Sequence, residues 1–287
     1  MFEFPALYKS ASQRSGEAQS QYLRLIAAEY TLLFIAAVMT LDLSRDRRYF
    51  VGYAFVFLAS LGFLIVRSWL KPEQQWYRAR ALAESVKTTC WRYCMGAEPF
   101  GRDDSDPVTR AEFRHHLHEI LKNNKDIDVS PDAADGEQIT PSMDLTRALT
   151  LAARKTFYLD HRIRDQRRWY VQKAIANKNA SKRWLIAGIA AYGAALVLVL
   201  SRIAYPDNWI WPIEPLIVIA SAIIGWTQVK KFNELASSYT LTAHEIGIIQ
   251  SRIRDVQKEA DFADFINEAE QAFSREHTQW VARQQTQ

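Results

Sequence analysis

The sequence predicts an all-α integral membrane protein: two tandem transmembrane helical hairpins (four spans) with a cytoplasmic helical body. Three observations lead to this fold class. Four runs are apolar and poor in charge, and each can cross a hydrocarbon core of about 30 Å. The runs form two similar pairs, and no stretch shows the period-two alternation typical of a strand. The four runs lie near residues 25–41, 49–66, 184–200 and 210–229.

The average composition hides this pattern, because 48% hydrophobic and 24% charged residues would suit a water-soluble protein. Two cysteines exclude a disulfide-stapled secreted scaffold, and ten glycines with nine prolines exclude a collagen-like chain. The first twenty residues carry Glu3 and Glu17 and lack an apolar core region, so the sequence predicts no signal peptide. The membrane assignment therefore depends on the internal runs.

The second and third runs give the clearest span signals. Residues 49–66 contain no charge and lie between Arg48 and Arg67, and residues 184–200 follow Lys182 and Arg183 directly. The first span must start near Tyr22 and take in Arg24 and Glu29, and the fourth opens with Pro212, Glu214 and Pro215. A pair of buried soluble helices is the alternative, but tryptophans stand at the ends of the runs, as in an interfacial aromatic belt. These are Trp69, Trp184, Trp209, Trp211 and Trp226.

The runs belong to a repeat. Residues 24–71 and 183–230 are both windows of 48 residues in which two apolar runs are joined by a short polar break. Each window therefore predicts a helical hairpin. Residues 162–183 hold eight basic residues against one acid, which places the middle of the chain and both termini in the cytoplasm. Reduced cytoplasmic thiols suit Cys90 and Cys94.

The remaining segments are predicted to be helical. Helices are expected at 76–95, at 106–125 with Asp106 as N-cap, from Met143 into the third span, and over 230–281, with an exposed loop at 126–142. The predicted organisation has five parts. They are an N-terminal segment (1–21), a first hairpin with its cytoplasmic helix (22–105), a helical and loop connector (106–157), a second hairpin with flanking helices (158–255) and a C-terminal helix (256–287).

Two stretches resemble the SLATT domains (SMODS- and SLOG-associated two-transmembrane effector domains) of prokaryotic conflict systems. The first is WYRARALAESVKTTCWRYCMGAEPF, which follows the first hairpin. The second precedes the other hairpin and has the pattern Y-x3-R-x2-DQ-x2-WY-x2-KA-x2-N. It comprises Tyr158, Arg162, Asp165, Gln166, Trp169, Tyr170, Lys173, Ala174 and Asn177. Two copies in tandem would cover most of residues 20–255.

The resemblance implies a pore-forming effector of antiviral defence. It would be governed by a nucleotide or oligonucleotide signal from a nucleotidyltransferase partner, and would act on the bacterial inner membrane of infected cells. A non-conducting membrane scaffold that recruits a cytoplasmic partner is the alternative. A transporter is a third possibility, disfavoured because a proline-broken span occurs once.

The sequence offers little for catalysis, so we expect no enzyme, no catalytic residue and no cofactor. It contains no phosphate-binding loop, nucleophile-elbow or HExxH motif. His115 and His118 share a helix face without a further ligand, so no metal site is expected. Cys90 and Cys94 are interpreted as packed thiols rather than as a metal or disulfide pair.

Three features are candidates for function. Glu29 lies inside a span, where an ionisable group faces either a conduit, as a pore-lining residue, or the interface. A basic-aromatic segment could bind phosphates and stack bases, or instead attract lipid headgroups. Its candidate ligand-binding residues are Arg162, Arg167, Arg168, Trp169 and Lys173, with Arg162, Trp169 and Lys173 expected on one face. Small residues of the third span, such as Gly188 and Gly193, suit tight packing, and a pore would require a homo-oligomer in the lipid bilayer.

Overall fold

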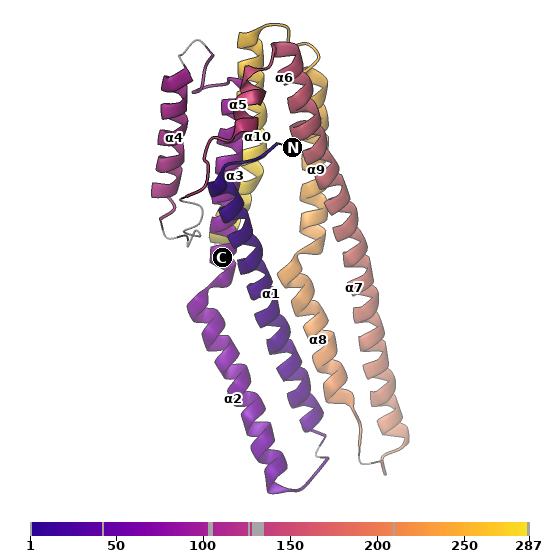
Figure 1. Cartoon of the computed structure of the whole chain (residues 1–287). Coiled ribbons are helices and arrows are strands. Elements are labelled where there is room, and N and C mark those ends of the chain that lie inside the picture. The colour runs from indigo at the N-terminus through magenta and orange to yellow at the C-terminus, as the bar shows by residue number, and fades with distance from the viewer. Residues whose placement is uncertain are drawn as a thin grey trace. The chain divides into compact units, whose positions relative to one another are not determined.

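The computed structural model describes residues 2–41, 43–102, 106–125, 127, 135–208 and 210–285, with side chains as far as Ser274. This part of the chain is helical and contains no strand (Figure 1). The helices are α1 (Ala6–Met39), α2 (Arg47–Leu70), α3 (Pro72–Met95), α4 (Asp106–Lys122), α5 (Pro141–Ala148), α6 (Leu151–Tyr158), the π-helix η2 (Leu159–Arg164), α7 (Asp165–Ala204), α8 (Ile213–Lys230), α9 (Phe232–Arg252) and α10 (Glu259–Gln285).

Four helical stretches are long and apolar enough to cross a membrane, by length and composition. They are Ala6–Met39, Arg47–Met95, Leu151–Ala204 and Ile213–Arg252. Each contains all or most of one of the four apolar runs, so the predicted all-α fold with four spans is confirmed. Trp209, one of the expected belt residues, lies outside the described residues.

The chain divides into two compact units. The body unit comprises Met1–Ser20, Pro72–Tyr170 and Thr242–Gln287. The span unit comprises Gln21–Lys71 and Val171–Leu241, and therefore includes both hairpins.

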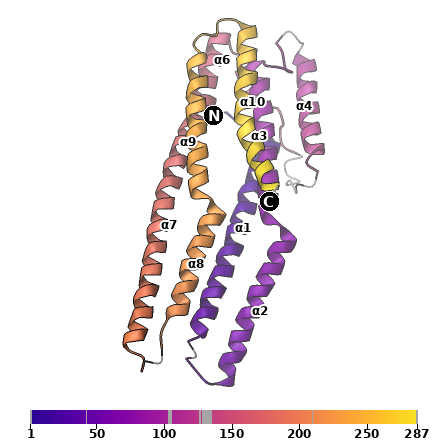
Figure 2. The same cartoon turned by 180° about the vertical axis from the view of Figure 1, so that it is seen from behind.

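Helix α3 is the centre of the body unit, and α10, α4 and α5 all pack against it (Figures 1 and 2). Its buried residues up to Val86, including Leu82, lie on one side at helical spacing, whereas around Trp91 most of the helix is buried. Helix α4 contributes Phe113 to this core, and α10 contributes Phe262. The body is thus a helix cluster with its own apolar core.

The span unit is held together by contacts within and between the hairpins. In the first hairpin, the Tyr49 hydroxyl donates to the Met39 carbonyl at 2.8 Å. In the second, Trp184 and Trp226 contact each other with ring centroids 6.4 Å apart. Helices α1 and α8 meet at Gly225, where an added Cβ would lie 2.2 Å from the hydroxyl oxygen of Tyr30.

The second helix of each hairpin, α2 or α8, ends in the same way. Helix α2 ends at Lys71 (φ 42°, ψ 50°) and α8 ends at Lys231 (φ 47°, ψ 41°), both in the left-handed conformation. Each lysine N–H donates to the carbonyl four residues earlier. Left-handed backbone is unusual for residues other than glycine, so this shared ending is a structural counterpart of the sequence repeat.

The helices around the third span differ from the expected single helix starting at Met143. Helix α5 begins at Pro141, and the chain breaks at Leu149 because the Thr150 side chain caps α6 by accepting from the Ala153 N–H at 3.4 Å. A π-turn then joins α6 to α7. The tail is also two helices, since α9 ends at Arg252 and α10 begins at Glu259.

Candidate functional site: the basic-aromatic segment and the buried arginines

Arg162 lies in the interior of the body unit. Its Nε and Nη2 donate to the two carboxylate oxygens of Glu270 on α10, at 2.8 and 2.6 Å. Tyr158 donates its hydroxyl to the same carboxylate at 2.8 Å, and all three side chains are buried. Burial alone would lower the pKa of Arg162, but the charge and hydrogen bonds of Glu270 raise it above its ordinary value. The guanidinium is therefore committed to an internal ion pair.

Two further polar side chains continue this buried network. Gln166 accepts from Arg162 Nη1 at 3.3 Å and from Lys87 Nζ at 3.4 Å. Burial, followed by the charge of Arg162, lowers the pKa of Lys87. The network thus joins α3, η2, α7 and α10 through paired and shared polar groups.

The other residues of the basic-aromatic segment lie nearer the surface. Arg168 and Lys173 are exposed, and Trp169 is half-buried with its ring edge-on to Tyr170. Arg167 is exposed and donates to Gln250 of α9 at 3.3 Å. The expected common face of Arg162, Trp169 and Lys173 is not observed, because Arg162 turns inward to Glu270 within the π-turn. A phosphate or a lipid headgroup could reach Arg168 and Lys173, but not Arg162.

Glu29 is paired inside the first hairpin. Its Oε1 lies 3.1 Å from Nε of Arg67 on α2, and its side chain is 14% exposed. The contact is ionic in character, since the same oxygen accepts no hydrogen bond. The structure therefore gives this carboxylate a partner of opposite charge, which lowers the cost of placing it within a span.

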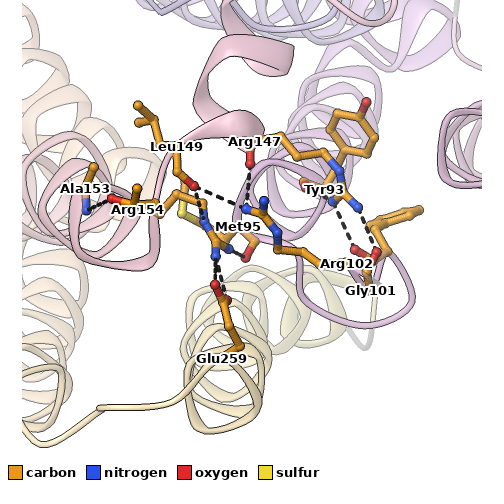
Figure 3. A network of polar contacts seen from close by, with 11 residues as sticks. Tyr93, Met95, Gly101, Arg102, Arg147, Leu149, Ala153, Arg154 and Glu259 are labelled. Atoms are coloured by element: carbon orange, nitrogen blue, oxygen red, sulfur yellow. Dashed lines mark hydrogen bonds and ion pairs between the residues drawn. The ribbon is translucent and has the colours of Figure 1, made fainter. Parts of the chain in front are cut away.

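A second group of arginines surrounds the C-terminal end of α3 (Figure 3). From α5, Arg147 donates to the carbonyls of Tyr93 and Gly101, both at 2.7 Å. From α6, Arg154 donates to the Met95 carbonyl at 2.5 Å and to both carboxylate oxygens of Glu259. Cations suit a helix C-terminus, where carbonyl oxygens lack partners.

Arg102 completes this group by donating to the carbonyls of Arg147 and Leu149 at 2.8 and 3.2 Å (Figure 3). Gly96 ends α3 at φ 69°, and an added Cβ there would lie 2.7 Å from Arg102 Cγ. Sequence reasoning missed these residues, since isolated arginines near Gly96 carry no recognisable motif. Their acceptors are mostly backbone carbonyls, so the group caps α3 and joins it to α5, α6 and α10.

The histidines, the cysteines and the small residues of the third span are the remaining sequence candidates. In the described part of the chain, no group of three or more His, Cys, Asp or Glu residues could hold a metal ion. Cys90 and Cys94 are free and buried, and burial raises the pKa of the Cys90 thiol well above its ordinary value. In the third span, Ala191 is buried, whereas a Cβ added to Gly193 would meet nothing within 4 Å.

Comparison with known proteins gives two matches that divide the chain. Residues 5–155 match the family described as SMODS and SLOG-associating 2TM effector domain 3. Residues 158–280 match the family described as SMODS and SLOG-associating 2TM effector domain 1. No curated protein and no solved structure matches the chain.

Proposed function

Because the chain belongs to the SMODS and SLOG-associating 2TM effector (SLATT) family, with two such domains in tandem, we propose that it is a pore-forming effector of prokaryotic antiviral defence. The protein assembles as a homo-oligomer in the inner membrane. It responds to a nucleotide-type signal from a nucleotidyltransferase partner, and it acts by permeabilising the membrane of the infected cell. The observation that carries the proposal is the tandem arrangement of two 2TM effector domains over four candidate spans.

Oligomerisation is proposed because one chain offers little to line a conduit. Helix α2 buries no residue, and its outward side chains are mostly large and apolar, including Phe55, Leu58 and Leu61. Glu29 is already paired with Arg67. A polar path would therefore have to form where several copies meet.

A non-conducting scaffold is the second candidate, and the Glu29–Arg67 contact favours it. A carboxylate that faces a guanidinium attracts cations less than an isolated one does. The scaffold would anchor the body unit at the membrane and recruit a cytoplasmic partner. The two functions differ in whether current flows.

Conduction is tested in planar bilayers that contain the purified protein. We expect single-channel currents, with Glu29→Gln lowering the preference for cations and Arg67→Gln raising it, because each removes one charge of the pair. Glu214→Gln, which changes an exposed carboxylate at the start of α8, is the control. If ion selectivity is unchanged in both variants, Glu29 does not line the conduit. No current with or without an extract of infected cells would leave the scaffold as the function.

The orientation is tested by thiol labelling of intact cells. In a background that lacks Cys90 and Cys94, cysteines introduced at Ser44 and Asp207 should react with a membrane-impermeant reagent, because both lie in the short breaks between spans. A cysteine introduced at Ala134, which lies outside the described residues, should stay unlabelled until the cells are opened. Labelling at position 134 in intact cells would contradict cytoplasmic placement of the connector.

Control by a signal is tested on the accessible part of the basic-aromatic segment. Arg162 is unsuitable because its substitution would break the pair with Glu270. If a phosphate-bearing ligand binds by stacking and paired hydrogen bonds, Trp169→Leu and Arg168→Lys should each reduce toxicity in cells that co-express the signal-producing enzyme. If the segment attracts lipid by charge, both variants should remain fully toxic. Membrane insertion, measured by fractionation, is the control for each variant.

A further inference from the structure

The N-terminal segment Phe2–Pro5 packs against the body unit before α1 begins. The ring of Phe2 stacks on Trp91 of α3, with centroids 5.0 Å apart and planes 14° apart. Phe2 also meets the edge of Phe157 on α6 at 5.7 Å, and Phe4 lies 6.1 Å from Trp91. Two rings of this segment thus cover a tryptophan that is 1% exposed.

The backbone of the same segment is bound by the residues around the start of α5. The Glu3 N–H donates to the Ser142 hydroxyl at 2.8 Å, and the Glu3 carbonyl accepts from the Thr140 hydroxyl at 2.8 Å. Thr140 is also the N-cap of α5. The segment is therefore held by specific hydrogen bonds as well as by ring contacts.

The loop before α5 also caps α1. The Ala6 N–H donates to the Glu137 carbonyl at 3.0 Å, and the Leu7 N–H donates to Gln138 Oε1 at 3.2 Å. These two donors would otherwise lack partners in the first turn of the helix. The start of α1 and the start of α5 are thus tied together by residues 2–7 and 137–142.

The contact is limited in extent and leaves one buried group unsatisfied. Phe2 and Phe4 are half-buried and Glu3 is exposed, so the segment lies at the surface of the unit. The indole Nε1–H of Trp91 is buried without an acceptor. A short surface segment of this kind opens locally without unfolding the core beneath it, so its contacts can be broken separately from those of α3.

We propose that Phe2–Pro5 is a releasable latch that holds the first turn of α1 on the α5 start and on Trp91. Helix α1 continues without a break from Ala6 to Met39 and includes the first candidate span. Release of the latch frees the capped end of this helix. The expected effect of release on membrane permeability rests on the proposed pore function, but the release of the segment does not depend on that function.

Release is measured on the full-length protein in detergent by amide hydrogen exchange. We expect the amides of residues 6 and 7 to exchange at least tenfold faster than those in the centre of α3, through an opening that leaves α3 protected. Phe2→Ala should accelerate this exchange a further tenfold without changing α3. Phe55→Ala, which removes an exposed ring from α2, is the matched control. If the amides of residues 6 and 7 exchange only when those of α3 also exchange, the segment does not open separately and the proposal is wrong.

The link to permeation is tested with a disulfide between cysteines introduced by Glu3→Cys and Ser142→Cys. Protein in phosphatidylethanolamine–phosphatidylglycerol liposomes should release an entrapped dye more slowly when this bond is formed, and a reductant should restore the rate. Glu3→Cys alone, treated with the same oxidant, should show no change. Equal release by the bonded and the reduced forms would overturn the regulatory role of the latch. Absence of release from every form would count against the pore, while hydrogen exchange would still decide whether the latch opens.

Discussion

Glu270→Gln is expected to destabilise the body unit by about 3–5 kcal/mol, the cost of breaking a buried ion pair by removing one partner. The substitution leaves the buried Arg162 guanidinium without a counter-charge and weakens the acceptor for Tyr158. Glu268→Gln, on the same helix, is the control, because its pair with Arg252 is exposed and should contribute less than about 1 kcal/mol. The free energy of unfolding of each variant is measured by urea denaturation in detergent, with hydrogen exchange of α3 as the probe.

A second variant separates loss of charge from loss of packing. Replacing both partners with leucine removes the uncompensated charge, so it should recover part of the stability that Glu270→Gln loses. Equal stability of Glu270→Gln and Glu268→Gln would show that the Arg162–Glu270 pair contributes nothing to the body unit. Arg162 would then again be a candidate for binding a ligand.

Gly225→Ala is expected to separate α1 from α8 and to destabilise the span unit by about 1–3 kcal/mol, as overpacking does in tightly packed interiors. The added Cβ would lie 2.2 Å from the Tyr30 hydroxyl oxygen and 2.9 Å from Cζ, so the ring must move. Gly193→Ala is the matched control, since its Cβ would meet nothing within 4 Å. The thermal unfolding midpoint in detergent measures the difference between the two.

In a protein that already carries Tyr30→Ala, adding Gly225→Ala should cost little further stability, because the atoms that the new methyl group would meet are gone. If Gly225→Ala and Gly193→Ala melt at the same temperature, the two hairpins do not depend on this close approach. The pair of glycines therefore distinguishes a packing position from an open one within the same unit.

The four spans could be predicted from the sequence because the bilayer imposes a length and excludes charge over one continuous segment. Residues 49–66 satisfy both conditions without reference to the rest of the chain. The hairpin repeat was visible for the same reason. The ends of the helices were harder to predict, because the break before α6 depends on a single hydroxyl cap at Thr150. Nothing in the sequence indicates that residues within the expected loop at 126–142 bind the N-terminal segment.

The candidate site was harder to predict, because the partner of each arginine lies far away in the chain. From the sequence alone, Arg162 and its basic neighbours are candidates either for binding a ligand or for attracting lipid headgroups. Its carboxylate partner is Glu270, which stands 108 residues later on another helix. The sequence likewise could not pair Glu29 with Arg67 or bring Arg154 to Glu259. Local spacing shows which residues share a helix face, but the tertiary fold decides which face is buried.

The left-handed lysines at the ends of α2 and α8 have a consequence for immersion depth. A left-handed residue ends the regular helix, and hydrocarbon supplies no donors for carbonyls that lack a partner at a helix end. We therefore expect Lys71 and Lys231 to lie where water and headgroups reach the backbone, with their ammonium groups close to lipid phosphates. Because each lysine ends the second helix of its hairpin, we expect the two hairpins to reach a similar depth in the bilayer.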